Sequence, residues 1–146
     1  MAASAAVERD TSEPRLSRNY VVKSASVAYP GALAGLDPVT GRTTPWADVA
    51  NYQFLGFYDG NATATGNAGG TVSASVDTSG RTLENVSVVG VTALTDVGKR
   101  VYASDDNTFT LTASANVNAI GRLVRWRTST FGDVQLFTAN DYTAGA

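Results

Sequence analysis

A short stretch of strict alternation, Thr108–Ala113, constrains the fold of this chain most. Apolar residues take every second position in it, and threonines take the others. Because successive side chains of a β-strand point to opposite faces, the pattern predicts a strand that buries Phe109, Leu111 and Ala113. The polar turn Asp105-Asp106-Asn107 precedes this strand, and a short β segment leads into the turn from Val97. The two segments are therefore expected to face each other across the turn.

The same reasoning predicts strands along most of the remaining chain. Their ranges are Tyr20–Tyr29, Asn51–Tyr58, Thr71–Asp77, Arg81–Val91, Ala119–Thr128 and Asp133–Thr138. Glycine and proline interrupt Gly31–Pro45, so this segment is expected to be mostly loop, and Trp46 after it is expected to cap the core. No segment carries an apolar stripe with the 3.6-residue period of a helix.

These elements predict one all-β domain, a compact antiparallel β-sandwich or barrel-like body over residues 20–146. A chain of 146 residues buries roughly 70% of its unfolded surface, which suffices for one core. Residues 1–19 show no strand pattern, and their apolar content is mostly alanine, too little to offset the entropy of ordering. Pro14 favours extended backbone there. The segment is either a frayed terminus or an extended N-terminal arm that orders on a partner.

The composition excludes several kinds of chemistry. The chain has no cysteine and no histidine, which removes Ser–His–Asp and Cys–His catalysis and the commonest metal ligand. Its aspartates and glutamates are scattered singly, so nothing selects a catalytic pair. We therefore expect no enzyme activity, no catalytic residue, no cofactor and no metal. A net charge of −2 argues against a broad surface for nucleic acid or an anionic membrane, and we expect neither as a partner, nor a small-molecule ligand.

Two local patterns resemble sites and have simpler interpretations. Asp105-Asp106-Asn107 could offer oxygens to calcium, but the spaced ligand set of a calcium loop is missing, so a tight turn is expected. Arg122, Arg125, Trp126 and Arg127 form the kind of basic-aromatic cluster that binds nucleic acids. The pleat splits this cluster, with Arg122 and Trp126 on one face and Arg125 and Arg127 on the other. We expect Trp126 in the core, and Arg125 and Arg127 either solvated or in a subunit contact.

The C-terminal third of the chain resembles the head-decoration, or cement, proteins of tailed bacteriophages. The resemblance begins at Gly98 and Val101-Tyr102 and continues through the polar turn. The motifs that carry the rest of it are Asp106–Thr112, Ile120-Gly121-Arg122-Leu123 and Val134-Gln135-Leu136-Phe137. The preceding two-thirds are similar only in kind, as an N-terminal arm followed by a β-rich body.

The resemblance implies a structural virion protein, made in the host cytoplasm, on the outer surface of an expanded capsid. Its partners would be the major capsid protein, whose neighbouring subunits it clamps together, and itself, as a homotrimer. The arm of such a protein reaches along the capsid subunit. The arm residues expected to contact the capsid are Val7, Arg9, Pro14, Arg15, Leu16 and Arg18.

Two other functions stay open at this point. Trp46, Tyr52, Tyr58 and Trp126 could stack on sugar rings, as in a carbohydrate-binding β module of a head fibre or adhesin. The chain could also be a ring-forming subunit of another phage assembly, such as a tail tube.

Overall fold

The computed structural model describes residues 17–23, 26–60, 62–63, 72–113, 116, 118–138 and 142. Within these ranges the regular structure is β-strand, with one short 3₁₀ turn, η1, at Leu94–Asp96. The first strands are β1 Ser17–Val21, β2 Val27–Ala28, β3 Leu33–Asp37, β4 Arg42–Pro45, β5 Gln53–Tyr58 and β6 Ala62–Thr63. They are followed by β7 Ser73–Asp77, β8 Thr82–Val89, β9 Arg100–Ala103, β10 Phe109–Thr110, β11 Ala119–Thr128 and β12 Phe131–Leu136. The expected all-β class is confirmed.

The C-terminal strands close into a barrel, with the order β10-β8-β12-β11-β9. The strands β12 and β9 flank β11 antiparallel, and β10 pairs with β9 across the predicted turn. The ring is completed by β10 and β8, which run parallel, with Phe109 opposite Val88. This parallel pair corrects the expectation of a wholly antiparallel body. Closure leaves the barrel without a free sheet edge, which removes the usual template for aggregation.

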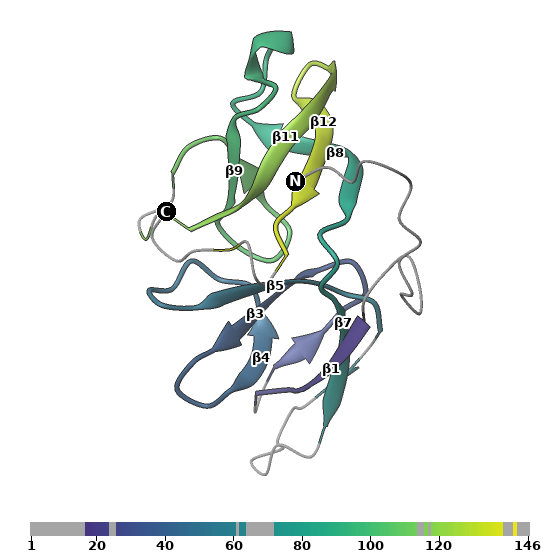
Figure 1. Cartoon of the computed structure of the whole chain (residues 1–146), viewed down its shortest axis with the longest axis vertical. Helices are drawn as coiled ribbons and strands as arrows, with labels where there is room; N and C mark the ends of the chain where they lie inside the picture. Colours follow the sequence, from purple (N-terminus) through teal and green to yellow (C-terminus); the bar gives the residue numbers. More distant parts are fainter. Residues whose placement is uncertain are drawn as a thin grey trace, which may run out of the picture.

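The N-terminal strands form a second sheet, ordered β1-β7-β5-β3-β4. The sheet is curled, because Val22, just after β1, bridges to Thr43 in the opposite edge strand β4. A small separate pair, β2 with β6, adds two further strands. In Figure 1 the barrel lies above this sheet, and the two bodies meet along β5.

Two hydrophobic cores hold the molecule together. One lies within the curled sheet, and its largest side chains are Tyr58, Leu55, Val22 and Val76. The other spans both bodies, because Leu33, Trp46 and Phe54 from the sheet pack with Val101, Ile120 and Leu123 from the barrel. The bodies therefore share a core, and of the two expected architectures the barrel is present in the C-terminal body.

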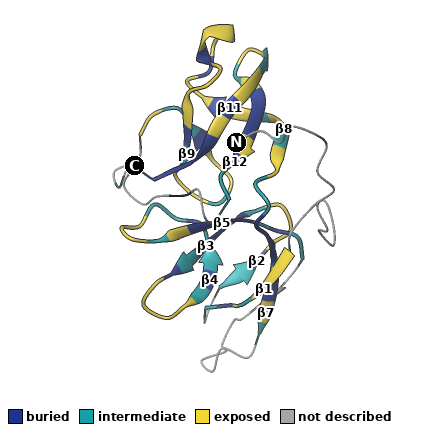
Figure 2. Cartoon of the chain, in the orientation of Figure 1, coloured by how far each residue is buried: buried dark blue, intermediate teal, exposed yellow. Residues whose placement is uncertain are grey.

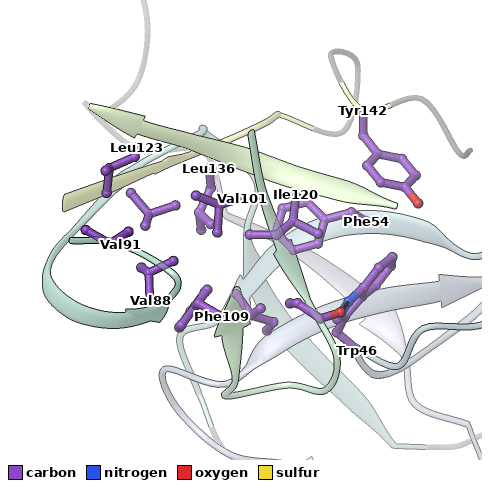
Figure 3. Packing of buried hydrophobic residues seen from close by; sticks show 13 residues of the cluster. Trp46, Phe54, Val88, Val91, Val101, Phe109, Ile120, Leu123, Leu136 and Tyr142 are labelled. Carbon is purple, nitrogen blue, oxygen red and sulfur yellow. Dashed lines mark hydrogen bonds between the residues drawn. The ribbon is translucent and has the colours of Figure 1, made fainter. Parts of the chain in front are cut away.

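Trp46 is the side chain that joins sheet and barrel, as Figure 3 shows. It is 1% exposed, and its indole Nε1 donates a hydrogen bond of 3.0 Å to the carbonyl oxygen of Ala103 in β9. The ring meets Phe54 edge-on, with centroids 5.6 Å apart, and Tyr142 edge-on at 5.9 Å. Trp46 was expected to cap the core, and it lies inside the core, between the two bodies.

Most strand predictions agree with the structure, and several bounds differ. The range of β11 is as predicted, and β5 and β7 lie within their predicted ranges, with Ala74 and Val76 of β7 buried. The range Tyr20–Tyr29 is corrected: β1 begins earlier, at Ser17, and ends at Val21, and β2 is a separate strand. The strand predicted at Asp133–Thr138 starts two residues earlier, at Phe131.

The strand predicted at Thr108–Ala113 is only partly confirmed. Phe109 is buried, but β10 ends at Thr110, Leu111 is half-buried and Ala113 is exposed. The backbone amide of Leu111 still donates to Val89, after which the chain leaves the barrel. The predicted turn is confirmed, since the Asp105 carboxylate accepts from the Asn107 amide and from the Thr108 hydroxyl.

The segment expected to be mostly loop is instead the hairpin of β3 and β4. Gly35 belongs inside β3, because a Cβ atom there would lie 3.0 Å from the ring of Trp46. The turn is closed by the Asp37 carboxylate, which accepts from the Val39 amide, and by Gly41 at φ +68°. The glycines that signalled a loop therefore serve close packing and a tight turn.

A buried polar pair inside the curled sheet provides a first prediction. Thr43 donates its hydroxyl to the Gly35 carbonyl oxygen at 2.8 Å, so the Tyr58 hydroxyl, also 2.8 Å away, donates to Thr43. Replacing Thr43 with valine keeps the shape of the side chain but leaves the buried Tyr58 hydroxyl without an acceptor. This loss should lower the free energy of unfolding by about 1–3 kcal/mol. Urea unfolding measures this, with Thr43→Ser as the control that keeps the hydroxyl and loses less.

Candidate interaction surfaces

The expected arm lies mostly outside the described residues. Val7, Arg9, Pro14, Arg15 and Leu16 belong to that part. Arg18 is described, and it is an exposed residue of β1, opposite Val76 of β7. Ser17–Asn19 were expected to belong to an arm without strand structure, and they instead form the start of an edge strand. An arm that leaves this edge would therefore comprise residues 1–16.

The arginines of β11 differ in exposure and in hydrogen-bond partners in a way that simple alternation along the strand does not predict. The register between β11 and β12 shifts between Leu123 and Arg125 and again between Trp126 and Thr128. Such bulges insert an extra residue and re-aim side chains. As a result Val124 and Arg125 are both exposed, while Leu123 is buried. The simple alternation of faces expected for this strand is therefore wrong beyond Leu123. It also fails near the start of the strand, where the register with β9 shifts between Ala119 and Gly121 and Ile120 is buried.

Arg127 is bound within the fold. Its guanidinium Nε and Nη2 donate to the two carboxylate oxygens of Asp133 at 2.6 and 3.0 Å, and Nη2 also reaches Glu84 at 3.1 Å. Asp133, whose side chain is 8% exposed, accepts in addition from the Asn85 amide of β8. Paired donation of this kind gives a strong, oriented contact. Arg127 thus connects β11, β12 and β8, and it was expected only as a solvated or subunit-contact residue.

Trp126 is half-buried and packs against the shared core, and its indole Nε1 donates to the Ser129 carbonyl oxygen at 3.0 Å. Of the other aromatic residues proposed for stacking on sugars, Trp46 and Tyr58 are enclosed, with exposed fractions of 1% and 0%. Rings enclosed on all sides have no face to offer a carbohydrate. The observations therefore favour the core interpretation for these two.

The outer face of β11 and its neighbour β9 carries a group of cations. Arg122 and Arg100 lie directly opposite each other in the ladder, and both are exposed. Val124 and Arg125 follow on the same strand, with Val124 41% exposed. We call Arg100, Arg122, Val124 and Arg125 the arginine face. Figure 2 shows that β11 is buried near its start and mostly exposed or half-buried further along.

The η1 turn stands beside the arginine face at the far end of the barrel from the sheet (Figure 1). The Asp96 carboxylate holds it, accepting from the Thr92 and Ala93 amides and from Lys99 Nζ at 2.7 Å. The chain after η1 continues as an extension of β9, since the Gly98 amide donates to the Leu123 carbonyl oxygen at 2.7 Å. This places two exposed apolar side chains, Leu94 and Val97, next to β11.

The described ranges hold no cluster of side chains suited to a metal ion, since no three acidic, histidine or cysteine side chains gather there. No helix there is long and apolar enough to cross a membrane.

Searches with this chain against protein-family models, curated proteins and solved structures found no match.

Three ion-paired carboxylates determine how the stability of the fold should change at acidic pH. Lys23 lowers the pKa of Asp37, Lys99 lowers that of Asp96 to about 2, and Arg127 lowers that of Asp133. A carboxyl whose pKa is lower in the folded than in the unfolded state stabilises the fold. This stabilisation is complete at pH values above the pKa of the unfolded state, and it is lost as the pH falls through the pKa of the folded state. Asp106 should have the opposite effect on the pH dependence of stability, because burial raises the pKa of its carboxyl.

We therefore expect the urea midpoint to be constant from neutral pH to about 5 and to fall between about 4 and 2. The Asp96→Asn variant should show a shallower fall over the lower part of this range. A midpoint that stays level down to pH 2, or an equal slope in the variant, would contradict the assignment.

Proposed function

We propose that this chain is a structural virion protein that binds the outside of an expanded phage capsid and bridges neighbouring major capsid protein subunits. The observation that carries the proposal is the set of C-terminal motifs that resemble head-decoration proteins. Within the fold these motifs lie on β9, β10, β11 and β12, which are neighbours in one closed barrel. The resemblance thus covers four of the five strands of the barrel, and β8 lies outside it.

The kind of fold is compatible with such a role. A decoration protein needs a stable body with an adhesive surface, and it needs no reaction centre. The described residues provide a closed barrel and a curled sheet joined by one core. We propose a homotrimer, in which one face of each copy meets a different face of the next and the ring closes.

The edge strand β1 supports a role for the arm. Residues 1–16 precede Ser17, which starts the edge strand of the N-terminal sheet. A segment there can add main-chain hydrogen bonds to an exposed strand of a capsid subunit, each contributing about 0.5–1.5 kcal/mol. Many copies on one shell multiply this modest contact.

The test uses expanded empty heads of the phage that encodes the chain. The purified protein is added, unbound protein is removed, and the temperature at which the heads come apart is measured. We expect the protein to sediment with the heads and to raise the disruption temperature. Failure to bind, or binding without a rise in that temperature, contradicts the proposal. Native mass spectrometry of the free protein should show trimers, whereas hexamers or dodecamers indicate a tail-type ring.

Deleting residues 1–16 tests the arm, and it leaves β1 intact because that strand begins at Ser17. We expect a folded protein whose affinity for heads falls by about tenfold or more, the loss of roughly two net hydrogen bonds. The matched control replaces the same residues with a glycine-serine linker of equal length, and it should bind as weakly as the deletion. Wild-type affinity in both variants removes the arm from the mechanism.

A further inference from the structure

The arginine face holds two like charges in direct opposition. Arg100 of β9 and Arg122 of β11 occupy paired positions of an antiparallel ladder. Side chains at such positions start about 4.5–5.5 Å apart, and like charges there destabilise the sheet. The Arg122 guanidinium is also tethered, because Nη1 donates to the Gly98 carbonyl oxygen at 3.0 Å. The fold therefore maintains a repulsive arrangement on its surface.

The other cations of the barrel are neutralised, which sets this face apart. Lys99 is paired with Asp96, Arg81 with Asp77, and Arg127 with Asp133. Arg100, Arg122 and Arg125 form no ion pair with any residue that the structure describes. Arg125 does lie opposite Asp133 in the ladder, and its charge helps to lower the pKa of that carboxyl. The cations of the barrel that lack an ion pair thus gather on one side of it, in a chain whose net charge is −2.

The centre of the face is aliphatic. Val124 is 41% exposed between Arg122 and Arg125 in the strand, and Leu94 of the neighbouring η1 turn is 69% exposed. Nucleic-acid sites of this size combine cations with exposed aromatic rings on which bases stack. Cations around an exposed aliphatic centre instead fit a protein surface that presents carboxylates around an apolar side chain, which resembles the charged rim and apolar core of protein interfaces.

We propose that the arginine face is the surface of the barrel that docks on an acidic, apolar-centred patch of the major capsid protein. This inference rests on the proposed function and adds to it a surface and the chemistry of its partner. Docking supplies the carboxylates that relieve the Arg100–Arg122 repulsion and covers Val124. Attraction between opposite charges also steers the encounter, so binding should weaken as salt is raised.

The test compares Arg100→Gln/Arg125→Gln with the wild type on the same empty heads. Neither arginine makes a hydrogen bond to another described residue, so the variant should fold, with a melting temperature equal to or above that of the wild type. The control, Arg42→Glu in β4 of the other body, changes the net charge by the same two units. We expect the double variant to bind about tenfold more weakly and with less dependence on salt, and the control to bind as the wild type does.

A second variant, Val124→Asp, places a carboxylate at the centre of the face and should also bind more weakly. If the wild type binds heads and both variants bind equally well, the arginine face is not the docking surface, although the proposed function stands. If the wild type does not bind, both proposals fail. If native mass spectrometry shows that the double variant forms a smaller oligomer than the wild type, the arginine face joins copies of this chain. Wild-type binding to duplex DNA that the double variant loses would mark a nucleic-acid surface. Either of these last two results overturns the inference.

Discussion

Trp46→Ala should lower the free energy of unfolding by about 3–5 kcal/mol, the cost typical of deleting a large aromatic side chain from a core. The indole is 1% exposed and fills the space between the sheet and the barrel. Its removal leaves a cavity next to Phe54 and Tyr142 and frees the Ala103 carbonyl oxygen that now accepts from Nε1. Because a small domain has a total stability of only about 5–15 kcal/mol, this is a large fraction of it.

Equilibrium urea unfolding, followed by far-UV circular dichroism, measures this loss. The matched control is Trp126→Ala, which deletes the same side chain from a half-buried site whose indole bonds only to the neighbouring Ser129. We expect the control to lose clearly less stability than Trp46→Ala. Equal losses at both positions would contradict the role of Trp46 as the contact that joins the two bodies.

Asp133→Ala should cause the next largest decrease in the free energy of unfolding. The carboxylate, 8% exposed, is held by both donor atoms of Arg127 and by the Asn85 amide, which lies where β8 departs from regular pairing at φ +53°. Its removal leaves a cation and a backbone amide without their acceptor. Breaking such a pair costs about 3–5 kcal/mol, and we expect the lower end, since Arg127 can still reach water and Glu84.

The control for this variant is Glu84→Ala, because Glu84 contacts the same guanidinium from a side chain that is 75% exposed. An exposed ion pair of this kind contributes at most about 1 kcal/mol. Thermal unfolding at neutral pH of both variants separates the two carboxylates. A loss for Asp133→Ala no greater than that for Glu84→Ala would show that the bulged strands β8 and β11 do not depend on this contact.

Local patterns in the sequence predicted the strands whose two faces differ. The burial of Ala74 and Val76 in β7 follows from alternation, which needs no knowledge of partners. The range of β11 was also predicted, although its faces do not alternate regularly. The hairpin β3–β4 was missed because Gly35 signals a break in the sequence, and only the position of Trp46 in space explains why a glycine is needed there.

The candidate surface was harder to predict from the sequence than the fold. The arginines of β11 were recognisable, but the bulge after Leu123 changes which of them point outward, and no local signal marks a bulge. The opposition of Arg100 and Arg122 depends on the pairing of β9 with β11, positions that are far apart in the chain. The parallel pairing of β10 with β8 is equally non-local, so the choice between sandwich and barrel stayed open.

Imaging expanded heads after incubation with this protein, by electron cryo-microscopy, tests the central proposal most directly. We predict added density on the outer surface, at positions of local threefold symmetry, into which the barrel and sheet fit with β11 turned toward the shell. Heads whose outer surface is unchanged at saturating protein, or density inside the shell or at the tail vertex alone, would contradict it.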